Sequence, residues 1–259
     1  MLQIDYFAHI NKLNHVNSFE KMVFSMGSLL LVLLLKNSWI SFLVLIVMSV
    51  FILFVAKIPI SYYGKLLLLP LSFLSIGSVS IVLSIAAAPS TGVHQAILLI
   101  KLANVYLYFL PDQVEVVVPL IIRSFSSICC LYFLILTTPI NEIVCLLHRW
   151  KVPTLLLEIM MLTYRYLFLL LETATDIYVS QKSRLGYQSI SSGLFSAGRL
   201  VTSLFIKTYH QAKELQISID SRGGGTLYDP SYERKNYSVI HIGFITVFFL
   251  AVLLLNFTS

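Results

Sequence analysis

Charged residues are scarce in this chain. Only 12% of its 259 residues are Asp, Glu, Lys or Arg, whereas a soluble domain carries about 25%. Apolar residues make up 58% of the chain. So few charges cannot solvate the surface of a globule, which excludes a water-soluble domain, a disordered tail and a disulfide-stapled secreted module. The composition instead predicts a polytopic membrane protein.

Motifs that carry chemistry are also missing. There is no G-x-x-x-x-G-K-[ST] loop to hold ATP phosphates and no His-Glu-x-x-His zinc motif. The six histidines are scattered over separate segments, whereas a metal site needs three or four converging ligands. The cysteines Cys129, Cys130 and Cys145 form no C-x-x-C pair and are predicted to be small apolar filler. We therefore predict no catalytic residue, no metal site and no cofactor in this chain, and no nucleic-acid partner.

Long apolar runs are abundant, and a helix that crosses a bilayer needs about 20 such residues. Five runs qualify as predicted spans: residues 21–35, 38–56, 66–88, 116–137 and 238–255. The apolar segment 95–110 contains Lys101 and aromatic residues, and it is interpreted as lying at the membrane interface. Arg123 falls inside the fourth run, where we expect it to snorkel or to pair near a helix end. The predicted fold class is an all-α membrane helical bundle.

Positive charge is unevenly distributed along the chain. Eleven of the eighteen Lys and Arg residues lie between positions 148 and 235. Because Lys and Arg are retained on the cytoplasmic side of a membrane, this segment is predicted to be a large cytoplasmic insert. The expected organisation is a membrane domain of four spans (1–140), cytoplasmic coupling helices (141–237) and a last span (238–259). The predicted location is the cell membrane, with several passes.

The first helix expected in the insert covers residues 154–182. Its apolar sequence contains Glu158 and Arg165, and each charge costs about 2.5–3.5 kcal/mol at the centre of a bilayer. We therefore expect this helix at or below the cytoplasmic interface, with a sixth span as the alternative. With Glu172 and Asp176 these charges form one stripe, which is predicted to be a solvated face.

The second expected helix covers residues 194–220 and is amphipathic. Its apolar residues recur with a period of 3.6 and form a predicted packing face: Leu194, Val201, Leu204, Phe205, Ala212, Leu215 and Ile219. At 1.5 Å per residue the helix is about 40 Å long, which is enough to run beneath a membrane domain.

Both helices of the insert end in the same way. Ser183-Arg184-Leu185 is followed by Gly186, and Ser221-Arg222 is followed by Gly223. One interpretation is a cation that favours the helix dipole followed by a glycine cap. The other is a pair of arginine plugs, because a guanidinium binds a carboxylate with two parallel hydrogen bonds and two such tips suit a partner with two similar acidic grooves. The candidate coupling residues are Ser183, Arg184, Leu185, Ser221, Arg222 and Gly223.

These features together resemble the transmembrane T component of energy-coupling factor transporters, in particular the CbiQ type of the cobalt and nickel systems. The resemblance is carried, in order along the chain, by Asp5-Tyr6, Glu20-Lys21, Leu136-Thr137-Thr138-Pro139, the segment 162–168 and the two arginine endings. Serine replaces the more usual alanine before both arginines, and Leu185 stands where the family often has glycine. The ordered set is more specific than any single motif.

The resemblance implies a function and partners. A T component joins two cytoplasmic ATP-binding-cassette ATPases, which hold ATP and Mg²⁺, to a separate membrane subunit that binds the substrate. The arginine endings would dock one in each ATPase, and the second helix would transmit the ATP-driven movement. Two alternatives remain: an ordinary ABC importer permease, which needs a Glu-Ala-Ala-type loop that we do not find, and an intramembrane enzyme, which needs paired catalytic residues within the spans.

Overall fold

The computed structural model describes residues 3–35, 37–86, 97–102, 105–109, 111–223 and 239–258. The chain forms two compact units. The bundle unit comprises Leu2–Pro139 with Lys235–Ser259, and the arm unit comprises Ile140–Arg234. We describe each unit by itself.

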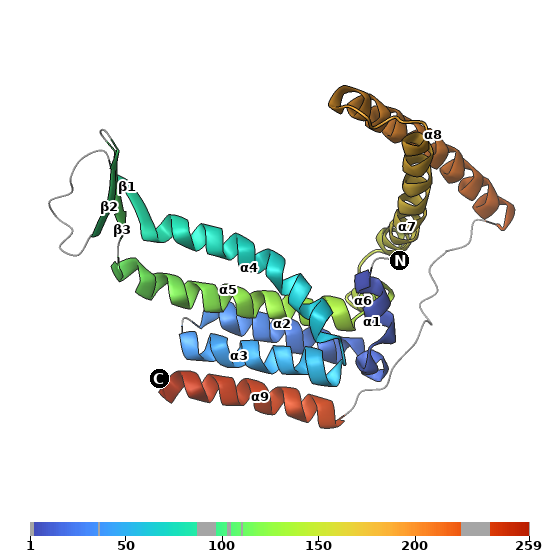
Figure 1. The fold of residues 1–259 in the computed structure, drawn as a ribbon. Coiled ribbons are helices and arrows are strands. Elements are labelled where there is room, and N and C mark those ends of the chain that lie inside the picture. The colour runs from blue at the N-terminus through green and yellow to red at the C-terminus, as the bar shows by residue number, and fades with distance from the viewer. Residues whose placement is uncertain are drawn as a thin grey trace. The chain divides into compact units, whose positions relative to one another are not determined.

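The bundle unit is built mainly of long helices, several of which run side by side (Figure 1). In chain order its helices are α1 (Gln3–Ile10), η1 (Lys12–His15), α2 (Ser18–Leu34), α3 (Ser38–Val50), η2 (Phe51–Val55), α4 (Ile60–Val82), α5 (Pro111–Thr137) and α9 (Val239–Thr258). The segment η2 is a π-helical continuation of α3. The fold is thus the helical membrane bundle that the composition predicts.

Within the described residues, four helices are long and apolar enough to cross a bilayer by length and composition. They are α3 with η2, α4, α5 and, in the arm unit, α7 (Thr154–Ser183), while α9 holds a shorter apolar stretch. The third predicted span, 66–88, needs correction, because α4 begins at Ile60 and ends at Val82. Residues 83–86 of that span instead form the strand β1 (Leu83–Ala86), and residues 87 and 88 lie outside the described residues.

A small antiparallel sheet follows α4, and the sequence analysis did not predict it. Its strands are β1, β2 (Ile97–Leu102) and β3 (Val105–Phe109), in the order β1-β3-β2. Leu83 and Ile97 both pair with Phe109, on opposite sides of β3. The sequence Val-Tyr-Leu-Tyr-Phe of β3 is rich in residues that favour strands, so the apolar segment predicted at the interface is largely a hairpin. Residues 95, 96, 103, 104 and 110 of that segment lie outside the described residues.

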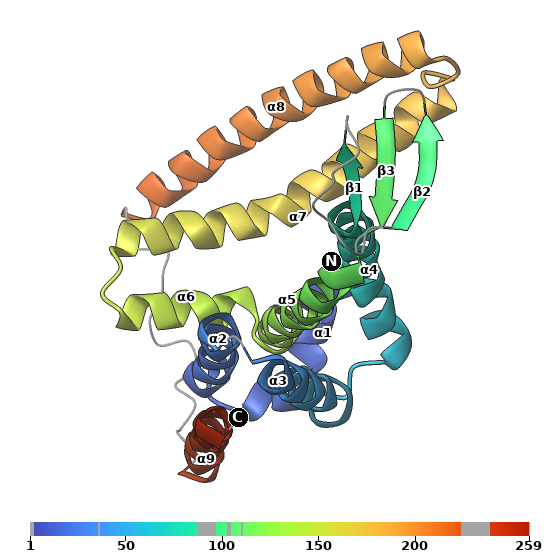
Figure 2. The ribbon, with the colours of Figure 1, turned by 90° about the vertical axis from the view of Figure 1, so that its left-hand side faces the viewer.

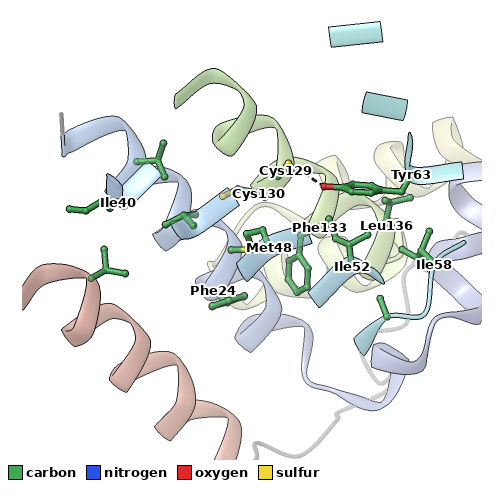
Figure 3. Close-up of a cluster of buried hydrophobic side chains, with 14 residues drawn as sticks. Phe24, Ile40, Met48, Ile52, Ile58, Tyr63, Cys129, Cys130, Phe133 and Leu136 are labelled. Carbon is green, nitrogen blue, oxygen red and sulfur yellow. Dashed lines mark hydrogen bonds between the residues drawn. The ribbon is translucent and has the colours of Figure 1, made fainter. Parts of the chain in front are cut away.

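The bundle core lies between α2, α3, α5 and α9 (Figure 3). Cys129 and Cys130 are buried there, as predicted for apolar filler. The Tyr63 hydroxyl lies 3.2 Å from the Cys129 sulfur and 3.0 Å from the Ser49 hydroxyl, so this tyrosine joins α4 to α5 and α3. The buried apolar residues of the core include Phe24, Met48, Ile52, Phe133 and Leu136.

Helices α2 and α5 are antiparallel, and each supplies a cation to the C-terminal carbonyls of the other. Lys21 of α2 donates to the Thr137 carbonyl over 2.9 Å, in a buried position at the end of α5. Arg123 of α5 donates to the carbonyls of Val32 and Leu33 at the end of α2, with 3.0 Å between its Nε and the Val32 oxygen. The last carbonyls of a helix lack intrahelical partners and carry negative partial charge. We call these two contacts the reciprocal cap, and they confirm that Arg123 pairs near a helix end.

Proline and glycine also shape the bundle. Pro70 lies inside α4 and cannot donate to the Leu66 carbonyl four residues earlier. The Tyr132 hydroxyl of α5 donates to that carbonyl over 3.0 Å, so the polar group stays paired. At Gly27 a Cβ atom would lie 2.4 Å from the Phe249 ring, so glycine lets α2 and α9 approach closely.

The arm unit consists of α6 (Ile140–Arg149), α7 and α8 (Ile190–Ser221). Val144 of α6 and Leu157 of α7 are both fully buried, and together they form a small hydrophobic core. Helix α8 runs back along α7 after a short turn (Figure 2). It begins at Ile190, four residues before the expected start, because Ser189 and Ser192 form a capping box. Gly193 is therefore inside the helix and does not break it.

The reciprocal cap predicts a stability difference between two lysines. Lys21→Met keeps the aliphatic stem but leaves the Thr137 carbonyl without its cation, so we expect the free energy of unfolding to fall by about 1–3 kcal/mol. Lys65→Met, at an exposed site on α4, should change it by less than about 0.5 kcal/mol. Denaturant unfolding of the purified protein in micelles measures both, and equal effects of the two substitutions would contradict the assignment.

Candidate functional site

The two arginine endings adopt the same backbone conformation. Arg184 is the C-cap of α7 with φ −91° and ψ 16°, and Arg222 is the C-cap of α8 with φ −93° and ψ 11°. The next residue is left-handed in both cases, with φ 61° at Leu185 and 86° at Gly223. The two endings, predicted from a shared sequence pattern, are thus the same structural motif, which we call the arginine tips.

Both guanidinium groups are available to a partner. Arg184 and Arg222 are exposed, and within the described part of the chain neither side chain has a hydrogen bond or an ion pair. The serines before them bond to their own helices, Ser183 to the Val179 carbonyl at 3.0 Å and Ser221 to the Ser218 carbonyl at 2.9 Å. Each tip therefore presents one planar five-donor group at the end of a rigid helix.

The tips lie at opposite ends of α8, as Figure 2 shows. Helix α8 has 32 residues and is therefore about 48 Å long. Arg184 precedes its first turn, and Arg222 follows its last residue. A single acidic groove cannot hold both arginines, so the arrangement suits two separate grooves.

The turn at the first tip is held by side-chain contacts that the sequence analysis missed. Ser196 of α8 donates its hydroxyl to the Gly186 carbonyl over 2.8 Å, and Gln181 of α7 donates to the Ser196 carbonyl over 3.1 Å. The Tyr187 hydroxyl donates to Gln181 over 2.7 Å. A Cβ at Gly186 would lie 2.7 Å from the Ser196 hydroxyl, so only glycine fits. The glycine two residues after Arg184 was the one sequence signal for this close approach.

An apolar groove of about 650 Å³ separates part of α7 from α8. From α8 it is lined by four residues of the predicted packing face, Leu204, Ala212, Leu215 and Ile219. The other three, Leu194, Val201 and Phe205, are 77%, 65% and 70% exposed. Within the described residues the predicted face is therefore divided: one part turns toward α7 and the other is open.

The charged stripe of α7 is mostly solvated. Arg165, Glu172 and Asp176 are exposed, as predicted. Glu158 is half-buried near the α6–α7 core, and its Oε1 has no hydrogen-bond partner among the described residues. In the described ranges, no three side chains of His, Cys, Asp or Glu come together as a metal-ligand set.

Comparisons with known proteins place the chain among transport proteins. Residues 11–233 match the family model described as CbiQ, cobalt transport protein. An uncharacterized protein of Methanocaldococcus jannaschii is 30% identical over 99% of this chain and 93% of its own length. The cobalt transport protein CbiQ of Rhodobacter capsulatus is 28% identical over 78% of this chain and 76% of its own. The protein of that name from Salmonella typhimurium is 25% identical over 85% and 96%.

The geometry of the first tip predicts that substitutions at the neighbouring residues Leu185 and Gly186 change the free energy of unfolding in opposite directions. Leu185→Gly relieves a left-handed leucine and should raise the free energy of unfolding by about 1 kcal/mol. Gly186→Ala should lower it by about 1–3 kcal/mol, because the new methyl group overlaps Ser196. Gly198→Ala, where a Cβ meets open space, is the control and should be stabilising by up to about 1 kcal/mol. Thermal unfolding in micelles, with hydrogen exchange of the turn, measures all three; a harmless Gly186→Ala would contradict the close approach.

Proposed function

The chain belongs to the CbiQ family of cobalt transport proteins, and on this premise we propose that it is the coupling subunit of an energy-coupling factor importer. It is a multi-pass membrane component of a transport system. In the proposal, two cytoplasmic ABC ATPases bind the arm unit, and a separate membrane subunit binds the substrate. ATP and Mg²⁺ are held by the ATPases, and this chain performs no chemistry. The names of the relatives favour cobalt as the substrate, with nickel as the related alternative.

The observation that carries the proposal is the pair of arginine tips. They share one backbone conformation, both arginines are exposed, and a helix of about 48 Å separates them. Two equivalent ATPases that each offer one acidic groove would meet two equivalent tips. Each arginine would bind a carboxylate with two charge-assisted hydrogen bonds, which are about twice as strong as neutral ones.

The arm unit also offers a route for movement. When ATP draws the two ATPases together, the tips that they hold are displaced. Helix α8 carries this displacement along its length, and the groove beside α7 gives it an apolar surface on which to shift. The open residues Leu194, Val201 and Phe205 would face the substrate-binding subunit of the assembled transporter. This is a two-state element biased by a ligand bound to another chain.

The proposal places residues 141–237 in the cytoplasm. Helix α7 is apolar and long enough to span a bilayer, but positive residues lie at both of its ends: Arg149 and Lys151 before it, Lys182 in its last turn and Arg184 at its C-cap. A spanning α7 would leave one of these pairs outside the cell, against the retention of Lys and Arg inside. We therefore assign α7 to the cytoplasmic interface.

The test is the double variant Arg184→Ala/Arg222→Ala, co-expressed with the ATPases of its transport system. Both arginines are exposed, so membrane yield and thermal stability should be unchanged. Binding of the ATPases should weaken on the order of 100-fold, because two charge-assisted contacts are lost, and metal uptake should fall with it. Co-purification and uptake are the measurements.

The matched control is Lys182→Ala/Lys207→Ala, which removes two exposed positive charges from the same helices but not from the tips. It should leave ATPase binding and uptake near wild type. Normal co-purification and uptake by the arginine double variant would overturn the proposed function. An equal loss of ATPase binding and uptake in the lysine control would show that the arginines contribute only positive charge and that their position at the tips is not important.

A further inference from the structure

The first arginine tip adopts its conformation at a local cost. Leu185 lies in the left-handed region with φ 61°, which a residue with a Cβ atom rarely adopts. Gly223 takes the same place at the second tip, where glycine adopts this conformation without strain. A strained residue persists only where the surrounding structure holds it in place, and such residues cluster at functional sites. We therefore looked for the contacts that hold the first tip.

The backbone of the first tip forms a Schellman motif that closes on Gln181 of α7. The Gly186 N–H donates to the Gln181 carbonyl over 3.0 Å. The Leu185 N–H donates to the Lys182 carbonyl over 3.0 Å, which completes the motif. The Arg184 N–H also donates to the Gln181 carbonyl, over 3.2 Å. The backbone that carries Arg184 is thus fixed by the position of Gln181.

The side chain of Gln181 uses both ends of its amide. Its Nε2 donates to the Ser196 carbonyl of α8 over 3.1 Å, and its Oε1 accepts the Tyr187 hydroxyl over 2.7 Å. Because a carbonyl can only accept, this orientation of the amide is the one that serves both neighbours. The Tyr187 ring lies against Tyr178 of α7, with 4.9 Å between the ring centroids. The Ser196 hydroxyl in turn donates to the Gly186 carbonyl over 2.8 Å.

These contacts hold the first tip to both α7 and α8 before any partner binds. None of them uses the Arg184 guanidinium, which stays exposed. A binding group that is already held in its bound geometry avoids the entropy cost of being ordered on association. At the second tip, a Cβ at Gly223 would have no neighbour within 4 Å in the described part of the chain. The two tips thus share a conformation, but different features hold it.

We propose that Gln181 and Tyr187 are positioning residues that hold the first tip ready for its ATPase before the ATPase binds. They act through the backbone from which Arg184 projects. The inference rests on the proposed coupling function and adds the residues that give the first tip its affinity. The ATPase at this tip binds a helix end that needs no rearrangement of its backbone.

A double-mutant cycle tests this role on the full-length chain, purified in detergent and titrated with the ATPases of its transport system. Gln181→Met keeps the length of the side chain but removes both amide contacts. It should weaken ATPase binding about fivefold, because the tip must then be ordered on binding. In the Arg184→Ala background it should change binding by less than about twofold, because the group that it positions is gone. In the Arg222→Ala background its effect should return in full.

Tyr187→Phe is the milder variant, because it removes one hydroxyl and keeps the ring against Tyr178. It should weaken ATPase binding in the same direction, and it should speed hydrogen exchange of the Leu185 and Gly186 amides in the free chain. Tyr209→Phe, at an exposed position on α8, is the matched control and should change neither quantity. The exchange measurement needs no ATPase, so it checks the contacts independently of the coupling role.

Two results would overturn the inference while leaving the coupling role intact. In the first, Gln181→Met binds the ATPases as the wild type does, although Arg184→Ala binds them weakly. In the second, Gln181→Met weakens binding equally with and without Arg184, which would show that its role is only structural. Normal binding by Arg184→Ala itself would overturn the coupling role of the first tip, and the positioning role with it.

Discussion

The reciprocal cap between α2 and α5 is the interaction on which the bundle unit depends. A buried cation and an unpaired helix carbonyl are each costly in hydrocarbon, and here each helix uses its cation to satisfy the end of the other. The two contacts fix the antiparallel register of α2 and α5 at both ends. They also fix Thr137, the last residue of α5, just before the bundle unit gives way to the arm unit at Pro139. The stretches Glu20-Lys21 and Leu136–Pro139, which looked like separate motifs in the sequence, thus meet through the bond from Lys21 to Thr137.

Amino-acid composition and the periodicity of apolar residues predict most of the fold, because they indicate where apolar surface must lie. The helical membrane class, the long helices and the two arginine endings follow from patterns within a few residues. The reciprocal cap could not be predicted, since it joins residues that are between 90 and 116 positions apart. The strand β3 was missed because a short apolar run suits an interfacial helix, a span or a strand equally well. The start of α8 was misplaced because Gly193 looked like a helix breaker, whereas the serine capping box outweighs it.

The sequence predicted which residues form the candidate site, but it did not predict their geometry. The pattern Ser-Arg identified both tips, yet nothing in it showed that Leu185 adopts the left-handed conformation that Gly223 adopts at the other end. A leucine there costs about 1–2 kcal/mol, and the contacts of Gly186 with Ser196 hold the turn in spite of it. The packing face of α8 was predicted as one surface, but the angle between α7 and α8 divides it.

The central claim is that both arginine tips face the cytoplasm. Cysteine accessibility tests it most directly, with Ser183→Cys and Ser221→Cys placed singly in a chain whose half-buried Cys145 is replaced by serine; Cys129 and Cys130 are buried. A membrane-impermeant maleimide should leave both positions unlabelled in intact cells and should label both in inside-out vesicles. Labelling of either position from outside the cell, or of the two from opposite sides, would contradict the account.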